Sequence, residues 1–143
     1  MSIDVVIATA PDERDDAFRV RIAVFVVEQG IPRSEELDAL DATATHAVGY
    51  VDGEPVAAGR LVLGEGYAKI GRMAVLREHR GHGFGAAILS ALEREAASRG
   101  LRLCRLSAQL HARGFYERCG YTAHGDVYDD VGISHIDMDK RLT

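Results

Sequence analysis

Apolar and polar positions in the first part of the chain predict a strand, a helix and a long irregular connection. Residues 3–8 form an apolar run typical of a strand, and Pro11 with the acidic residues after it marks the start of a helix. Helical spacing would turn three large apolar side chains to one face of this helix: Phe18, Ile22 and Phe25. Residues 30–46 break the pattern, so we expect one helical turn there within an irregular segment.

A hairpin and a further strand come next. Two apolar runs, residues 46–51 and 56–63, flank Asp52-Gly53, and Asp-Gly between such runs favours a tight reversal. A second reversal at residues 64–66 leads into a strand at residues 68–76. The three strands are therefore expected to form an antiparallel meander.

The second half of the pattern predicts two helices between strands. Apolar side chains recur at helical spacing after Gly85 and stop at Gly100, which predicts a helix over residues 83–99. A shorter helical stripe ends at Gly120. Three more strands are expected, at residues 101–108, 121–128 and 133–140. This order of elements predicts an α/β (α+β) chain with one mixed central sheet flanked by helices, in a single domain over residues 1–143.

Composition narrows the class of partner. The apolar fraction of 47% and the charged fraction of 27% are ordinary for a globular protein, and no apolar run approaches the about 20 residues that cross a membrane. The N-terminus lacks the basic start of a secretory signal, so a cytoplasmic location without membrane partners is expected. A net charge of −5 with dispersed Lys and Arg argues against nucleic acid. Cys104 and Cys119 are expected to be buried free thiols.

The turn before the long helix is suited to phosphate. It reads Arg80-Gly-His-Gly-Phe-Gly-Ala86, and its glycines let the main chain approach a ligand closely. The helix start adds unpaired N–H donors and about half a positive charge, and Arg80 adds a charged donor. A merely flexible turn is one alternative. A dinucleotide-binding fold is another, but its glycine motif follows the first strand of a repeated strand-helix-strand unit, whereas this turn follows a meander.

Two motifs together resemble a known family. Arg80-x-x-Gly83-x-Gly85 after the strand Arg72-Met-Ala-Val is similar to the acyl-CoA signature of the GNAT N-acetyltransferases, and residues 112–121 look like that family's fourth helix. The likeness covers nearly the whole chain. Several segments look like the ElaA-type bacterial branch: residues 24–29, 36–38, 107–109 and 132–135, with His46. The tail, residues 127–138, also resembles the glyphosate N-acetyltransferase group.

The resemblance implies how acetyl-CoA binds. The sheet of the GNAT fold is splayed between two parallel strands, here residues 68–76 and 101–108, and the pantetheine arm inserts there like an added strand. Main-chain groups of Met73 and Val75 would bind the arm, and one of their N–H groups would stabilise the oxyanion. The implied cofactor-binding residues are Met73, Ala74, Val75, Arg80, Gly81, His82, Gly83, Phe84, Gly85, Ala86, Gln109 and Tyr116. Gln109 stands where the superfamily often has Asn, which leaves open how the arm is held at that point.

Acyl transfer to an amine needs a base and an acid. An amine with a pKa near 10.4 is mostly protonated at about pH 7, so its proton must be removed before attack. The resemblance assigns the acid to Tyr116, whose hydroxyl would protonate the leaving thiolate. Helical spacing also allows a plain core role for it, since it belongs to an apolar stripe: Ala112, Phe115, Tyr116 and Cys119.

His135 is the first candidate for the base, because imidazole titrates near neutrality and the matching tail in the glyphosate-acetylating group uses a histidine. A structural histidine is the alternative. Glu28, His46 and His111 are further candidates. No metal site is expected, because no cluster has ligand spacing. One acidic set would either attract a cationic acceptor or form a solvated loop: Glu35, Glu36, Asp38 and Asp41.

The sequence therefore favours an acetyl-CoA-dependent N-acetyltransferase that acts on a small amine or an amino acid. Acetylation of a protein lysine or N-terminus, a non-catalytic acyl-CoA-binding module and an unrelated nucleotide-phosphate binder are the alternatives. The identity of the amine stays open, as does the oligomeric state, for which a homodimer is among the states considered.

Overall fold

The computed structural model describes residues 2–143, and its seven strands form one sheet in the order β1-β2-β3-β4-β5-β7-β6. The strands are β1 (Asp4–Ile7), β2 (Thr45–Val51), β3 (Glu54–Leu63), β4 (Ala68–Val75), β5 (Leu103–Gln109), β6 (Thr122–Asp130) and β7 (Ile133–Arg141). β4 and β5 run parallel, and the other five neighbouring pairs are antiparallel. The expected mixed sheet is confirmed.

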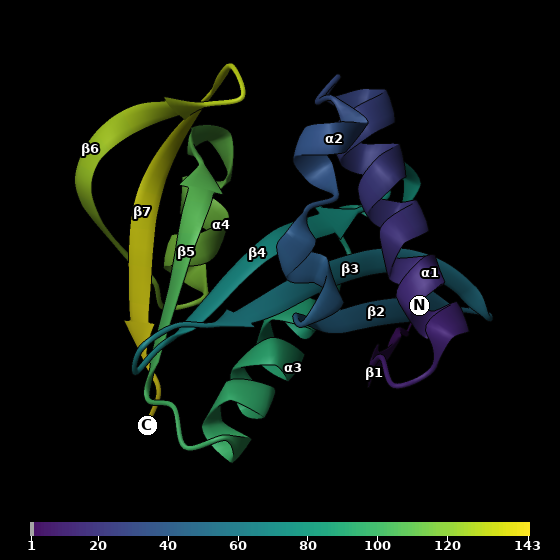
Figure 1. The fold of residues 1–143 in the computed structure, drawn as a ribbon, viewed down its shortest axis with the longest axis horizontal. Coiled ribbons are helices and arrows are strands. Elements are labelled where there is room, and N and C mark those ends of the chain that lie inside the picture. Colours follow the sequence, from purple (N-terminus) through teal and green to yellow (C-terminus); the bar gives the residue numbers. More distant parts are fainter. Residues whose placement is uncertain (1) are drawn as a thin grey trace.

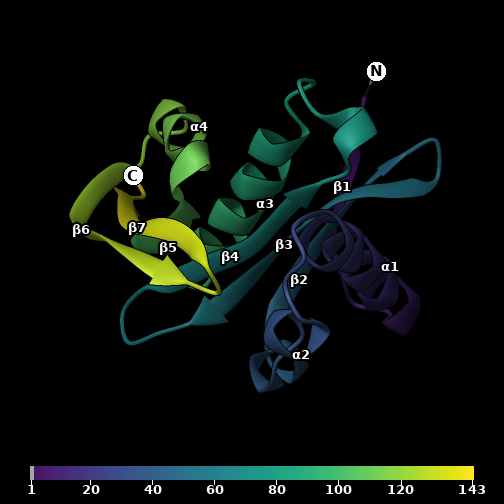
Figure 2. The same ribbon diagram turned by 90° about the horizontal axis from the view of Figure 1, so that it is seen from above.

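Helices cover both faces of the sheet (Figures 1 and 2). They are α1 (Pro11–Arg21) with its continuation η1 (Ile22–Glu28), α2 (Arg33–Glu36), η2 (Ala39–Ala42), η3 (Arg77–His79), α3 (Phe84–Ser98), η4 (Leu110–Ala112) and α4 (Arg113–Arg118). A larger apolar core packs between the sheet and α3, and a smaller one packs between the sheet and α1–η1. The cleft described below lies between the two groups of helices.

The first helix differs from its predicted form in one respect. Phe25 is buried as expected, but Phe18 and Ile22 are only half-buried, and the smaller core instead contains Ala17, Val20 and Val24. The chain is wound as a π-helix over η1, where each N–H bonds five residues back. The buried residues Ala17, Val20 and Val24 keep ordinary helical spacing, so the helix is rotated about its axis relative to the predicted stripe.

The sheet splits between β4 and β5. Their ladder has three residue pairs, from Ala68↔Cys104 to Ile70↔Leu106. Beyond that point β4 stays paired with β3 as far as Val75, and β5 stays paired with β7 as far as Gln109. The two strands therefore diverge while each keeps its outer partner, as Figure 1 shows. This confirms the splay that the resemblance implied.

A β-bulge lies in β4 beside the split. Ala58 pairs with Ala74 and Arg60 pairs with Gly71, so that Gly59 in β3 faces two residues of β4, Arg72 and Met73. A side chain at Gly59 would clash, because its Cβ would lie 2.7 Å from the sulfur of Met73. The bulge turns the main chain of β4 just where the cleft begins.

Both cysteines are free; Cys104 in β5 is buried and Cys119 is half-buried. Across residues 2–143, no helix combines the length and the apolar character that a membrane span requires.

Candidate active site

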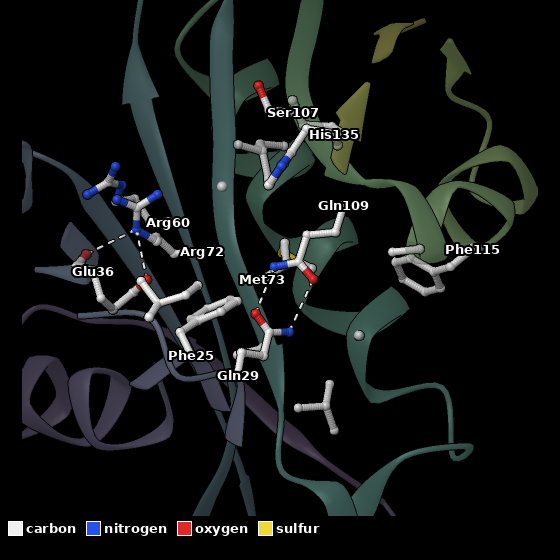
Figure 3. Close-up of a pocket in the computed structure, with 18 of the residues that line it drawn as sticks. Phe25, Gln29, Glu36, Arg60, Arg72, Met73, Ser107, Gln109, Phe115 and His135 are labelled. Atoms are coloured by element: carbon white, nitrogen blue, oxygen red, sulfur yellow. Dashed lines mark hydrogen bonds and ion pairs between the residues drawn. The ribbon is translucent and has the colours of Figure 1, made fainter. Parts of the chain in front are cut away.

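The gap between β4 and β5 opens into a cleft of about 1220 Å³ (Figure 3). η1 and α2 form one wall, and β5, α4 and the β6–β7 turn form the other. The cleft brings together most of the predicted site: Glu28, Met73, Ala74, Val75, Arg80, Gly81, Gly83, Phe84, Gly85, Gln109, Tyr116 and His135. Two predicted residues, His82 and Ala86, are exposed and lie outside its lining.

The glycine turn presents main-chain donors to one end of the cleft. Gly81 and Gly83 have φ of 82° and 80°, which a residue with a side chain adopts only with strain. Gly83 is the N-cap of α3, and the first helical hydrogen bond runs from the N–H of Ala87 to its carbonyl. The N–H groups of residues 84–86 consequently have no partner within the helix. This arrangement suits an anion such as a pyrophosphate.

Glu28 and Arg80, which were predicted for different roles, form an ion pair with each other. Two nitrogens of Arg80 donate to the carboxylate at 2.8 and 2.7 Å, and Arg77 approaches it to 3.4 Å. The hydrogen bond from Arg80 lowers the pKa of Glu28 to about 2. A carboxylate with so low a pKa is a weak proton acceptor, so this pairing argues against Glu28 as the base.

Main-chain groups of β4 face the split. The N–H of Leu76 donates to the carbonyl of Val56 in β3 at 2.9 Å. Because main-chain groups alternate along a regular ladder, those of Ala74 also face β3, whereas those of Val75 face the cleft. Met73 lies in the bulge, where this alternation is interrupted. The side chain of Arg80 already donates to the carbonyl of Val75 at 2.9 Å. Ala74 thus lines the cleft without offering it a main-chain donor.

Tyr116 belongs both to the larger core and to the cleft lining. Tyr116 is 8% exposed, and its ring makes edge contacts with Phe115 and Tyr121. Burial raises the pKa of its hydroxyl well above the usual value, so the group stays protonated. Within residues 2–143 no protein group hydrogen-bonds to this hydroxyl, which leaves its proton free to be donated.

His135 has a fixed orientation and one free ring nitrogen. The ring lines the cleft, is 7% exposed and stacks on Tyr128. Its Nδ1 is 2.8 Å from the carbonyl oxygen of Ile133. Since a carbonyl can only accept, Nδ1 carries the proton in the neutral ring and Nε2 keeps its lone pair. This is the arrangement that a general base requires.

The other two histidine candidates lie in different places. His46 is 2% exposed beneath α1, its Nε2 donates to the carbonyl of Asp41, and burial lowers its pKa. It is outside the cleft lining, so the structure excludes it as the base in this state. His111 lines the cleft, and its Nε2 donates to the side-chain oxygen of Gln109 at 2.7 Å.

A pair of glutamines crosses the cleft. Gln29 donates to Gln109 at 3.1 Å, and Gln109 donates back at 2.8 Å, so each amide is both donor and acceptor (Figure 3). Gln29 follows η1 and Gln109 ends β5. The role of Gln29 could not be predicted from the sequence, because nothing in the local pattern links two residues 80 positions apart.

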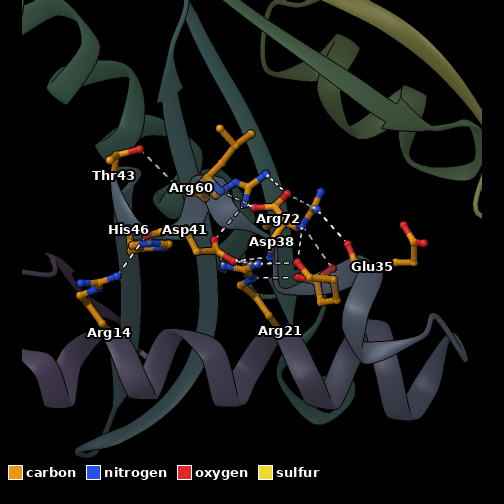
Figure 4. A network of polar contacts seen from close by, with 11 residues as sticks. Arg14, Arg21, Glu35, Asp38, Asp41, Thr43, His46, Arg60 and Arg72 are labelled. Carbon is orange, nitrogen blue, oxygen red and sulfur yellow. Dashed lines mark hydrogen bonds and ion pairs between the residues drawn. The ribbon is translucent and has the colours of Figure 1, made fainter.

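Three members of the acidic set, Glu36, Asp38 and Asp41, are part of a largely buried ion network, so the expected solvated loop is wrong for them (Figure 4). Arg21 is fully buried and bonds Glu36 at 2.7 Å and Asp41 at 2.8 Å. Arg60 bonds Asp41 and Asp38. Burial alone would raise the pKa of Asp41, but hydrogen bonds from the two arginines hold it well below its usual range. Burial does raise the pKa of Glu36, despite its bond to Arg21.

Comparison with known proteins identifies the family. Residues 9–142 match the acetyltransferase (GNAT) domain. The chain belongs to the GNAT acetyltransferase family. It is 42% identical to the uncharacterised N-acetyltransferase YjcF of Bacillus subtilis over 136 residues, which is 94% of this chain and 97% of YjcF. This GNAT domain is therefore an acyltransferase.

Solved structures agree with this assignment. The GNAT domain superposes on an acyl-CoA N-acyltransferase from Pseudomonas aeruginosa with a TM-score of 0.86 and 32% identity, over 97% of this chain and 99% of that one. It superposes on Escherichia coli ElaA with a TM-score of 0.82 and 26% identity, over 97% and 98% of the two chains. ElaA is thus among the structural neighbours of this GNAT domain.

Proposed function

We propose that this GNAT domain transfers the acetyl group of acetyl-CoA to a primary amine of a small molecule or amino acid, by direct attack within a ternary complex. The observation that carries the proposal is the open side of β4, which runs from the split in the sheet to the glycine turn, in a chain of an acetyltransferase family. The proposal includes one cytoplasmic domain over residues 1–143 and a relation to the ElaA-type branch and the glyphosate-acetylating group.

The cleft supports this binding mode for acetyl-CoA. Amide groups of the pantetheine arm would pair with main-chain groups of Met73 and Val75, next to the side chain of Gln109. The pyrophosphate would bind at the N–H groups of residues 84–86. Arg80 would join this site once it leaves Glu28 and the carbonyl of Val75, to which it is bonded now.

The chemistry follows from the same residues. The Nε2 atom of His135 takes a proton from the amine, and the amine nitrogen then forms a bond to the thioester carbon. A cleft-facing N–H group of β4 stabilises the oxyanion. The carbon–sulfur bond breaks, Tyr116 gives its proton to the leaving sulfur, and the nitrogen releases its remaining extra proton to solvent as the amide forms. The products are the N-acetyl amine and CoA; Tyr116 regains a proton and His135 loses one through solvent.

A paired substitution tests the proposal. Gly83→Trp places a bulky side chain on the phosphate turn, and Gly53→Trp is a matched control, because Gly53 also has φ of 80°, has open space around it and lies outside the cleft. Calorimetry should show micromolar binding of acetyl-CoA to the wild type and to Gly53→Trp, with loss in Gly83→Trp. Thiol release from acetyl-CoA with a panel of amino acids, polyamines and short peptides then identifies the best acceptor. Failure of the folded wild type to bind acetyl-CoA would refute the proposed function.

A further inference from the structure

Arg72 has an unusual main-chain conformation at the bulge of β4. Its φ is +54°, in the left-handed region that residues with a side chain rarely adopt. It shares the bulge with Met73, which lines the cleft. Such a conformation persists only where its surroundings hold it.

The side chain of Arg72 supplies contacts that hold it. Its Nε donates to the carbonyl of Glu36 at 3.1 Å and lies 3.3 Å from the carboxylate of the same residue. Its Nη2 donates to the carbonyl of Glu35 at 3.3 Å and to the carboxylate of Asp38 at 3.2 Å. Arg72 is thus bonded to residues 35–38, which are the end of α2 and the turn after it. Figure 4 shows its guanidinium among these groups.

Residues 35–38 are also held by two other arginines. Arg21 in α1 bonds the carboxylate and the carbonyl of Glu36, and Arg60 in β3 bonds Asp38. Of these three arginines, Arg72 is the one in the strand that carries the bulge. Glu35, Glu36 and Asp38 line the cleft. Arg72 therefore joins one wall of the cleft directly to the main chain next to Met73.

We propose that Arg72 is a positioning residue that fixes the acceptor side of the cleft, the wall of residues 35–38, relative to the thioester-binding bulge. The inference rests on the proposed function. The side chain of Arg72 sets the distance between the wall that holds the amine and the N–H groups that receive the acetyl-CoA carbonyl. Loss of this tie leaves both parts folded but lets them move independently.

Three substitutions separate the side chain from the main chain. Arg72→Gly removes the side chain while glycine accepts the left-handed conformation freely. We expect the Kd for acetyl-CoA to stay within about twofold of wild type, while the KM of the best amine from the panel rises about tenfold, as loss of charged hydrogen bonds implies. Arg72→Ala also disfavours the bulge, so its acetyl-CoA affinity should fall about fivefold or more. Arg72→Lys should recover part of the amine KM.

Amide hydrogen exchange gives a second readout that needs acetyl-CoA alone. In the wild type, acetyl-CoA should slow exchange both in residues 72–75 and in residues 33–38, because coupling between two sites is reciprocal. In Arg72→Gly, or in Arg72→Lys if the glycine variant does not fold, protection of residues 33–38 should be reduced while that of residues 72–75 remains.

The outcomes are distinct. An unchanged amine KM with a lower melting temperature, or equal protection of residues 33–38 in variant and wild type, would show that Arg72 is merely structural and overturn the inference. Lack of acetyl-CoA binding by the wild type would instead refute the proposed function on which the inference rests. This result would be known before any variant of Arg72 is made.

Discussion

The carboxylate of Glu28 binds both terminal nitrogens of Arg80, and the third nitrogen of that guanidinium donates to the carbonyl of Val75. Arg80 is thereby held by groups of the protein at the place where acetyl-CoA is proposed to bind. Glu28 competes with phosphate for the same cation.

Glu28→Gln should therefore tighten binding of acetyl-CoA. An exposed ion pair contributes about 0–1 kcal/mol, so its removal should lower Kd by up to about fivefold. The gain should be the same at pH 6 and pH 8, because a pKa of about 2 leaves Glu28 ionised at both. Calorimetry measures this, with Glu117→Gln as the control, since Glu117 pairs with Arg113 outside the cleft. Weaker binding by Glu28→Gln would mean that Glu28 orients Arg80 for phosphate instead.

Tyr116→Phe should lower kcat by about 10- to 100-fold through loss of the acid, and leave acetyl-CoA affinity nearly unchanged. Stability should change little, because the hydroxyl has no protein partner within residues 2–143. Tyr121→Phe is the matched control: its hydroxyl donates to Glu93 at 2.8 Å, away from the cleft. That variant should lose about 1–3 kcal/mol of unfolding free energy and keep its kcat. Equal kcat in Tyr116→Phe and wild type would assign Tyr116 to the core alone.

His135→Gln should lower kcat/KM by about 10²-fold or more. Steady-state rates at pH 7 with the best amine of the panel test this. The control is His124→Gln, since His124 is half-exposed on β6 and outside the cleft. An unchanged kcat/KM in His135→Gln would point to another base, with His111 the remaining histidine candidate in the lining.

Arg21→Met should cost about 3–5 kcal/mol of unfolding free energy, since it removes the fully buried cation that bonds both Glu36 and Asp41 and leaves each with one arginine partner. The folded protein holds the pKa of Asp41 below its unfolded value of about 3.9, so this contribution is full above that pH and is lost as the pH falls below it. Urea unfolding at pH 7 and pH 3 should show a smaller difference between variant and wild type at pH 3. Arg19→Met, at an exposed position of the same helix, should change stability by less than about 1 kcal/mol.

The order of the elements along the chain and the glycine turn could be predicted because their signals are local. Asp52-Gly53 marks a reversal, Gly100 and Gly120 follow helix ends, and the turn at Gly83 needs a residue that tolerates positive φ. Each depends on a few neighbouring residues. The split between β4 and β5 was instead implied by the family resemblance. Met73 and Val75 were named from the same family motif, and their roles in binding stay a prediction.

The features that were missed depend on partners far away in the chain. The burial of Arg21 follows from Glu36 and Asp41, 15 and 20 residues later, because an arginine without such partners is almost never fully buried. The π-helical winding of η1 likewise has no signal in the local pattern. The pairing of Glu28 with Arg80 joins residues 52 positions apart, and each was interpreted separately.

The glutamine pair that crosses the cleft carries no net charge. Dissolved salt weakens contacts between exposed ions over a Debye length of about 8 Å at physiological strength, but it leaves a pair of neutral amides nearly unchanged. Gln29 and Gln109 therefore hold the two sides of the cleft together at any ionic strength, whereas the hold of Glu28 on Arg80 loosens as salt rises. The salt dependence of ligand affinity would consequently report the ion pair of Glu28 with Arg80 and not the glutamine pair. A salt titration therefore distinguishes these two contacts without any substitution.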